Sequence, residues 1–382
     1  MRAFTIMAGL MVLLVAVPRH GDGDAPEALP KLRVGHVGHD HQIALSVAAE
    51  RGRALERPYG VWLKVLKPQE AYVLYDLGRP VARITLVRVG GGAKMPSALA
   101  QGRIEIGLGG LGPVLKFVDA GAPLKVVAPL NTDGDALVIR SGLKASDWAG
   151  FVRLVKSSPK PLRIGYKDPF ANAYLIFSRA LDEEQIRHGR EHAAPDGRPV
   201  QVITVDLQDD ENMLPAMERG IVDGVVANEP APSLLVQNKV GSWVADLSDL
   251  PPLGKWRNHP CCVVAASDKA LKQKRDIIKS FLKVIAAGSD VVLRDKESAL
   301  TVEAKWTGNA PEVAWSSVSH VVYVGRAGEA WIAAVDVWLD MLSSSQAFQK
   351  DLKGRSALDI RSVAFDLAPL NEALAEMPAR SR

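Results

Sequence analysis

The chain has 382 residues, of which 47% are hydrophobic and 24% charged, and these proportions are those of a folded globular protein and exclude a disordered chain. The formal net charge is only +4, and the lysines and arginines are spread along the sequence. Without a concentrated basic stripe, we expect no nucleic-acid partner.

The N-terminus predicts export. Arg2 precedes an apolar run from Phe4 to Val17, and polar, proline-rich residues follow it. This is the pattern of a secretory signal peptide, which we place at residues 1–24. The run is shorter than the roughly 20 residues that cross a bilayer, and the only cysteines, Cys261 and Cys262, lie too far away to carry a lipid anchor. We expect a soluble periplasmic or extracytoplasmic protein without a lipid anchor.

Past residue 30, short apolar strands, turn-forming loops and amphipathic helices alternate, which predicts an α/β fold with mostly parallel sheets. Segments of the first part also match later ones. LRVGHVGHDHQIALSVAAE (32–50) lines up with LRIGYKDPFANAYLIFSRA (162–180), and ALAQGRIEIGLGGLGP (98–113) lines up with AMERGIVDGVVANEPA (216–231). We therefore predict two related lobes, each a mixed sheet flanked by helices.

Two strand-like segments, ALVIR (136–140) and CCVVAAS (261–267), occupy equivalent places and predict where the chain crosses between lobes. Lobe one is then residues 31–138 and 263–382, and lobe two is residues 139–262. We expect the lobes to rotate about the two segments when a ligand binds.

Three further elements are predicted outside the repeat. Apolar residues spaced by three and four predict helices at 274–292 and 329–345, packed on lobe one. Residues 70–89 alternate apolar and polar side chains around Leu77-Gly78, which predicts a β-hairpin insertion.

The loops after the repeated strands predict a ligand site, because ligands bind at the carboxyl ends of parallel strands. The loops GHDHQ (38–42) and KDPFAN (167–172) should face each other across the cleft, each leading into a helix whose N-terminus can seat an anion. The predicted ligand contacts in these loops are His39, Asp40, His41, Lys167, Phe170, Ala171 and Asn172.

A second pair of loops, GLGGLG (107–112) and ANEP (227–230), should also reach the cleft, and NTDGD (131–135) precedes the first crossing strand. GLGGLG fits a dinucleotide-binding fingerprint, but it lacks the first-strand position and the acidic residue that this fingerprint requires. A loop that allows close backbone approach is the favoured interpretation. The predicted contacts here are Gly109, Gly110, Thr132, Asn228 and Glu229.

A metal site is the alternative at the first loop, because His36, His39 and His41 with Asp40 are zinc or copper ligand types. These positions fall at a strand end and in a tight loop, where side chains diverge. We therefore expect His39 and His41 to serve an anion and not a metal, with helix capping as the structural alternative for His41. The two cysteines are interpreted as small buried thiols, with a strained vicinal bridge as the alternative.

The order of these motifs resembles the periplasmic solute-binding proteins of ABC importers, in the nitrate, sulfonate and taurine branch. The resemblance rests on ALAQGRIEIGLGG, DAGAPLKVVAPL, PLRIGYKDPFANAYL, GIVDGVVANEP and NHPCCVVAAS, and it covers nearly the whole mature chain. It implies the two-lobe periplasmic-binding-protein fold (type II), a small anion held between the lobes, an ABC permease as membrane partner, a monomer, and neither enzymatic activity nor a cofactor.

The chain departs from the nitrate type at Ala171-Asn172-Ala173, which favours a sulfonate or other organic anion. The same fold resembles the enzyme that makes the thiamine pyrimidine precursor, which relies on a cysteine-rich stretch and a cofactor lysine. Here HPCC holds only two thiols. That enzyme type stays the alternative function, together with zinc binding through His36, His39 and His41.

Overall fold

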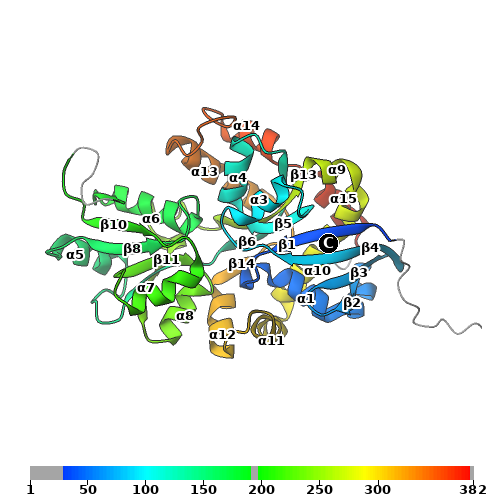
Figure 1. Ribbon diagram of the computed structural model, residues 1–382, viewed down its shortest axis with the longest axis horizontal. Helices are drawn as coiled ribbons and strands as arrows, with labels where there is room; N and C mark the ends of the chain where they lie inside the picture. The colour runs from blue at the N-terminus through cyan, green and yellow to red at the C-terminus, as the bar shows by residue number, and fades with distance from the viewer. Residues whose placement is uncertain (1–28, 191–196, 379–382) are drawn as a thin grey trace, which may run out of the picture.

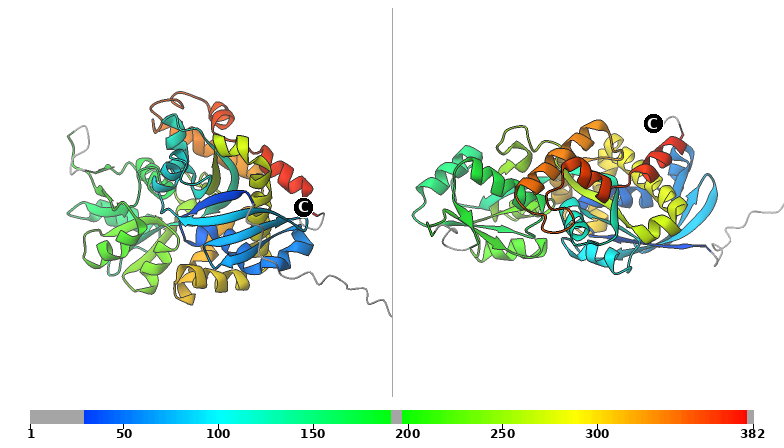
Figure 2. Two further views of the ribbon diagram at one scale, coloured as in Figure 1. Left: turned by 45° about the vertical axis from the view of Figure 1, so that its right-hand side comes forward. Right: turned by 90° about the horizontal axis from the view of Figure 1, so that it is seen from above.

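The computed structural model describes residues 29–190 and 197–378. The signal peptide predicted at 1–24 lies outside the described residues. Two sheets lie side by side with helices on their faces, and the chain passes between them (Figures 1 and 2). The predicted α/β class with two mixed, helix-flanked sheets is confirmed.

The larger sheet has eight strands in the order β14-β6-β13-β5-β1-β4-β3-β2. The central strand β1 runs parallel to β4 and β5. The hairpin predicted at 70–89 is confirmed, since β3 and β4 pair antiparallel around Leu77 and Gly78, both with positive φ. The strands are β1 (Lys31–His36), β2 (Val61–Lys67), β3 (Ala71–Asp76), β4 (Arg79–Arg88), β5 (Ile106–Gly110), β6 (Leu124–Asp133), β13 (Pro260–Ser267) and β14 (Val321–Tyr323).

The smaller sheet has six strands in the order β12-β7-β11-β8-β10-β9. Its central strand β8 runs parallel to β10 and β11, as β1 does to its own neighbours, so the sequence repeat corresponds to a structural repeat. The strands are β7 (Asp135–Arg140), β8 (Leu162–Tyr166), β9 (His188–Gly189), β10 (Val202–Asp206), β11 (Gly224–Asn228) and β12 (Gly241–Asp246).

The chain changes sheets immediately before β7 and immediately before β13. β7 lies antiparallel to β11 in the smaller sheet, and β13 lies antiparallel to β5 at the matching place in the larger one. The residues predicted as lobe boundaries, 138 and 263, therefore fall inside strands, and the sheets change at Gly134 and before Pro260. The division of the chain into two lobes stays our proposal.

Helices bury both faces of the larger sheet. Successive residues of β6 and β13 point to opposite faces, and the apolar residues on each face pack into a separate cluster. Val126 and Val263 join one hydrophobic cluster, and Val127 and Val264 join another. These helices are α1 (Ile43–Arg51), α2 (Glu56–Tyr59), α3 (Lys94–Ala100), α4 (Leu111–Asp119), α9 (Asp268–Gln273), α10 (Arg275–Arg294), α11 (Lys296–Thr307), α12 (Pro311–His320), α13 (Glu329–Ser344), α14 (Ala357–Ala364) and α15 (Ala368–Glu376).

The two predicted helices of the C-terminal part are confirmed as α10 and α13. α10 packs closely on α1, where Gly288 leaves no room for a side chain: a Cβ there would lie 1.9 Å from the Ala44 carbonyl oxygen. On another turn of α10, the buried Lys283 forms ion pairs of 2.8 Å with Asp76 at the end of β3 and with Glu376 of α15. This lysine therefore links three elements.

Among the described residues, four helices cover the smaller sheet, namely α5 (Trp148–Ser157), α6 (Asn172–Glu183), α7 (Met213–Glu218) and α8 (Ala231–Gln237). α12 belongs to the C-terminal part but lies against α8, at the junction of the two halves in Figure 1. His320 at its end stacks on Trp243 of β12, with ring centroids 4.3 Å apart, and its Nδ1 lies 3.0 Å from a Glu229 carboxylate oxygen. In the described part of the chain, no helix is long and apolar enough to span a membrane.

Candidate functional site

A small cavity lies between the two sheets, at the carboxyl ends of β1, β5, β8 and β11. Its volume is about 40 Å³. A cavity of this size has room for only a few water molecules. Any ligand enclosed here without further opening must be small.

Seven of the twelve predicted ligand contacts line this cavity. The loop after β1 supplies one histidine, the end of β5 two glycines, and the two loops of the smaller sheet the remainder. They are His39, Gly109, Gly110, Lys167, Ala171, Asn172 and Asn228.

The other five lie outside the lining. Asp40 and His41 belong to a 3₁₀ turn behind the wall and are fully buried. Thr132 is buried in β6 and donates to Asp133. The ammonium nitrogen of Lys116 lies over the ring of Phe170, 3.7 Å from the ring centroid. Glu229 is buried and accepts from Ser233 near α12.

The two halves meet closely around the cavity. A Cβ at Gly112, in the first turn of α4, would lie 2.2 Å from the carbonyl oxygen of Phe170 in the smaller half. Lys94 of α3 pairs with Asp209 at 2.6 Å, and the Asn172 amide donates to the Pro260 carbonyl at 2.6 Å. The two halves are therefore in direct contact beside the cavity.

Two helix N-termini reach this cavity. α4 begins after Gly110 and α6 after Ala171. Neither of these N-cap residues has a side chain that can accept a hydrogen bond from the helix backbone. Both N-caps line the cavity. Backbone N–H groups at such ends carry partial positive charge and favour an anion.

Two charged side chains on the wall, Lys167 and Asp135, are paired. Lys167 pairs with Asp210 at 2.8 Å, and although burial opposes the charge, Asp210 raises the pKa of Lys167. Asp135 accepts from His259 at 2.7 Å. Burial lowers the pKa of His259, but its bonds to Asp133 and Asp135 outweigh burial and raise it to about 10. Lys167 is therefore a cation at neutral pH, and the charge of Asp135 is compensated.

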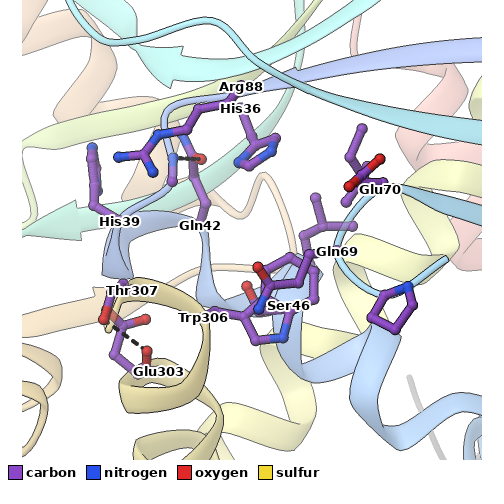
Figure 3. A pocket seen from close by; sticks show the side chains of 14 residues that line it. His36, His39, Gln42, Ser46, Gln69, Glu70, Arg88, Glu303, Trp306 and Thr307 are labelled. Atoms are coloured by element: carbon purple, nitrogen blue, oxygen red, sulfur yellow. Dashed lines mark hydrogen bonds between the residues drawn. The ribbon is translucent and has the colours of Figure 1, made fainter. Parts of the chain in front are cut away.

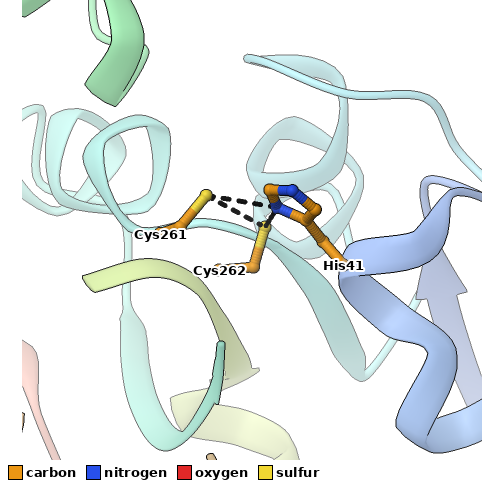
Figure 4. Close-up of side chains that lie close together, drawn as sticks. All are labelled: His41, Cys261 and Cys262. Carbon is orange, nitrogen blue, oxygen red and sulfur yellow. Dashed lines mark hydrogen bonds between the residues drawn. The ribbon is translucent and has the colours of Figure 1, made fainter. Parts of the chain in front are cut away.

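The two cysteines also line the cavity, with His41 directly behind them (Figure 4). Both thiols are free, and their sulfurs lie 4.0 Å apart. His41 Nδ1 lies 3.2 Å from the sulfur of Cys261 and 3.7 Å from that of Cys262. A hydrogen bond from Cys261, with the nearby imidazole of His41, lowers the pKa of Cys262 although burial opposes this.

A local irregularity of β13 makes this cluster possible. Adjacent residues of a regular strand point to opposite faces. The pairing of β13 with β6 shifts register on both sides of Cys262, which is characteristic of a bulge. Both thiols can therefore approach the same imidazole.

A larger cavity of about 240 Å³ lies on the other side of His39, between β1, the β2–β3 turn and α11 (Figure 3). His36, Arg88, Gln69 and Glu303 are among its lining residues. Burial, followed by the charge of Arg88, lowers the pKa of His36 to about 4, so this imidazole is neutral. His36 and His41 therefore lie in different environments, and the three-histidine cluster considered from sequence does not assemble as one group.

Several lining residues were missed by the sequence analysis, among them Cys261, Cys262, Asp135 and Asp168. The one available signal was the position of the cysteines at the predicted return strand. The strand order was needed to place them, because β13 pairs Cys262 with Gly110 of the glycine loop.

The NMT1-like family model matches residues 25–307, which is well over half of the chain. The chain belongs to the NMT1-like family. An uncharacterised protein of Methanocaldococcus jannaschii is 33% identical to this member over 106 residues, which are 28% of this chain and 73% of that protein.

Three solved structures that are similar to this NMT1-like protein are described as binding proteins. The ligand-binding component of an ABC-type import system from Staphylococcus aureus, with zinc bound, has a TM-score of 0.69 at 14% identity and covers 90% of this chain and 99% of its own. The nitrate-binding protein NrtA from Synechocystis has a TM-score of 0.67 at 13% identity, covering 94% and 92%. The alkanesulfonate-binding protein SsuA from Xanthomonas axonopodis pv. citri, bound to MOPS, has a TM-score of 0.60 at 19% identity, covering 85% and 96%.

At these identities the likeness establishes the fold, which is the periplasmic-binding-protein fold expected from the sequence. The resemblance to solute-binding proteins of ABC importers is thereby confirmed at the level of family and fold.

Proposed function

We propose that this NMT1-like protein is the extracytoplasmic solute-binding component of an ABC importer and captures a small anion in the cavity between its two sheets. The solute is a sulfonate, nitrate or another organic anion, and a membrane permease receives it. The protein acts as a monomer.

One observation carries the choice of an anion: the uncapped N-termini of α4 and α6 meet at the same small cavity, beside the ammonium of Lys167. Two partial positive charges favour a negative ligand, and Lys167, although it is paired with Asp210, keeps ammonium N–H groups that can donate to it. The competing carboxylate of Asp135 is compensated by His259. The volume of about 40 Å³ favours a compact anion or the head group of a larger one.

The test is calorimetric titration of nitrate, short sulfonates and carboxylates into metal-stripped protein, guided by mass spectrometry of whatever small molecule co-purifies. We expect one of these anions to bind with one-to-one stoichiometry. His39→Ala and Lys167→Met should each weaken that binding roughly ten- to a hundredfold, because a charge-assisted hydrogen bond contributes about 1.5 to 3 kcal/mol.

Lys144→Met is the matched control. Lys144 is exposed on the smaller half, away from the cavity, so this substitution removes the same charge without touching the cavity wall. If Lys144→Met weakens anion binding as much as Lys167→Met does, the effect reflects the net charge of the protein alone. Absence of binding by every anion of the panel would contradict the proposal.

An enzyme of the thiamine-pyrimidine precursor type is less well supported by the cavity. A lysine that forms a Schiff base needs a lowered pKa, whereas the pKa of Lys167 is raised by Asp210. We expect purified protein mixed with pyridoxal phosphate to show no absorbance of an internal Schiff base. Such a band, lost in Lys167→Met, would favour the enzyme instead.

A further inference from the structure

We propose that His41, Cys261 and Cys262 form a binding site for a thiophilic metal ion, Zn²⁺ or Cu⁺, in the wall of the cavity. The site goes beyond anion binding and does not depend on it. It also departs from our sequence-based expectation that His41 serves an anion, because the sequence did not show that the cysteines come to lie against it.

The spacing of the three donor atoms fits such an ion. With Zn–S bonds of about 2.3 Å and a Zn–N bond of about 2.0 Å, tetrahedral angles place two sulfurs about 3.8 Å apart and each sulfur about 3.5 Å from the nitrogen. The observed S···S distance is 4.0 Å, and the N···S distances are 3.2 and 3.7 Å. Small side-chain adjustments suffice to complete three bonds.

The neighbouring amide leaves the imidazole in the state that binds metal. The side-chain oxygen of Asn131 accepts from the Cys262 backbone N–H at 3.2 Å, and this orients its amide nitrogen toward His41 Nδ1, also at 3.2 Å. An amide nitrogen only donates, so this contact favours the tautomer of His41 that has a lone pair on Nδ1. This lone pair faces the two sulfurs (Figure 4), and an ion would replace the amide as its partner.

Burial gives the site a direction of access. His41 is fully buried and does not line the cavity, whereas both cysteines do. An ion therefore enters from the cavity and is held between the thiols and the imidazole, with its remaining coordination position open toward the cleft. Two thiolates are soft donors and an imidazole is a borderline one, and this set selects Zn²⁺ or Cu⁺ over Mg²⁺ or Ca²⁺. Binding releases the thiol protons and involves no change of oxidation state.

The experiment titrates Zn²⁺ into protein that has been stripped with EDTA and kept reduced, in competition with a colorimetric zinc chelator and without any anion ligand. We expect one equivalent to bind and to protect both thiols from iodoacetamide. Co²⁺ at the same site should give thiolate-to-metal charge-transfer absorption. Cys261→Ser and Cys262→Ser should each weaken zinc binding about a hundredfold or more, since each substitution removes one of the three bonds between the protein and the metal.

His36→Ala is the matched histidine control, since His36 lies in the other cavity, and it should bind zinc as the wild type does. Zinc binding that survives in the Cys261→Ser, Cys262→Ser double variant, or that is lost in His36→Ala, would overturn the proposal. The thiol protection uses the unaltered chain, so it decides the question even if a cysteine variant misfolds. Equal alkylation rates with and without Zn²⁺ or Cu⁺ would also overturn it.

Discussion

Lys283 is a residue whose energetic role depends on burial more than on charge. Its side chain is 2% exposed, and Asp76, its partner at the end of β3, is 10% exposed. Ser280 also donates to Asp76, at 2.6 Å. Two charges withdrawn from water are stabilising only as a pair, because either one alone would remain buried without compensation.

We expect Lys283→Met to lower the free energy of unfolding by about 3 to 5 kcal/mol, since it leaves the Asp76 carboxylate without its cation. Urea unfolding followed by circular dichroism measures the change. Lys279→Met on the same helix is the control, since Lys279 pairs with Glu376 and the exposed Asp276 and should contribute about 1 kcal/mol or less. Equal losses in the two variants would show that burial does not distinguish these lysines.

The seven ligand contacts that were predicted and line the cavity follow the repeated strand-loop-helix units, which is why the sequence could indicate them. His39 and Lys167, for example, each follow a strand of the same pattern. The metal-site candidate could not be predicted, because His41 and Cys261 are far apart in the chain and meet only through the strand order of the larger sheet. The bulge that turns both thiols to one side has no recognisable signal in CCVVAAS.

Among the elements, α12 ties the C-terminal part of the chain to α8, which covers the smaller sheet. It contacts α8 through a hydrogen bond from Ser233 to Ser316 and through the His320–Glu229 pair. Burial raises the pKa of Glu229, and the bond to Glu229 raises the pKa of His320. Both groups therefore bind protons more tightly in the folded protein than in the unfolded chain.

Because the folded state holds more protons here, the stability contributed by this contact must decrease as pH rises. The part due to His320 is fully present below the ordinary histidine pKa of about 6.5 and is lost as pH rises through the higher folded value. We expect His320→Gln to be less stable than wild type at pH 5, with a difference that shrinks toward pH 8. Urea unfolding at several pH values measures it. A difference that is independent of pH would show that stacking on Trp243, and not charge, holds α12 in place.

Most elements were predictable because their apolar periodicity is regular, as in α10 and α13, or because they repeat. The bounds of the crossing strands were harder to predict from the sequence. β7 and β13 read as strands from their apolar residues, but nothing in ALVIR indicates that the change of sheet occurs before it, at Gly134. That position depends on pairing with β11 and β5, which are partners distant in sequence.

At the scale of the molecule, Gly112 is a place where the two halves approach closely beside the cavity. An alanine there would push its Cβ against the Phe170 carbonyl oxygen, which belongs to the other half. We expect Gly112→Ala to favour an open cleft, with a larger radius of gyration in small-angle scattering and weaker ligand binding. Wild-type protein should become more compact when its anion is added.

Gly328→Ala is the control for this variant, since a Cβ at Gly328 meets no atom within 4 Å. It should scatter and bind as wild type does. If the Gly112→Ala profile matches that of wild type both with and without ligand, the closed contact does not govern the opening of the cleft.

The exchange of β7 and β13 between the sheets also has a consequence for the order in which the chain can fold during synthesis. β7 to β12 follow one another without interruption, so the smaller sheet can form from one continuous stretch of chain. The larger sheet lacks the strand between β5 and β6 until β13 has been made, and β14 comes later still. Domains generally fold as units as the chain emerges, and distant pairings form slowly. The edges of β5 and β6 in the larger sheet therefore stay unpaired until β13 has been synthesised. By then, all strands of the smaller sheet have already been made.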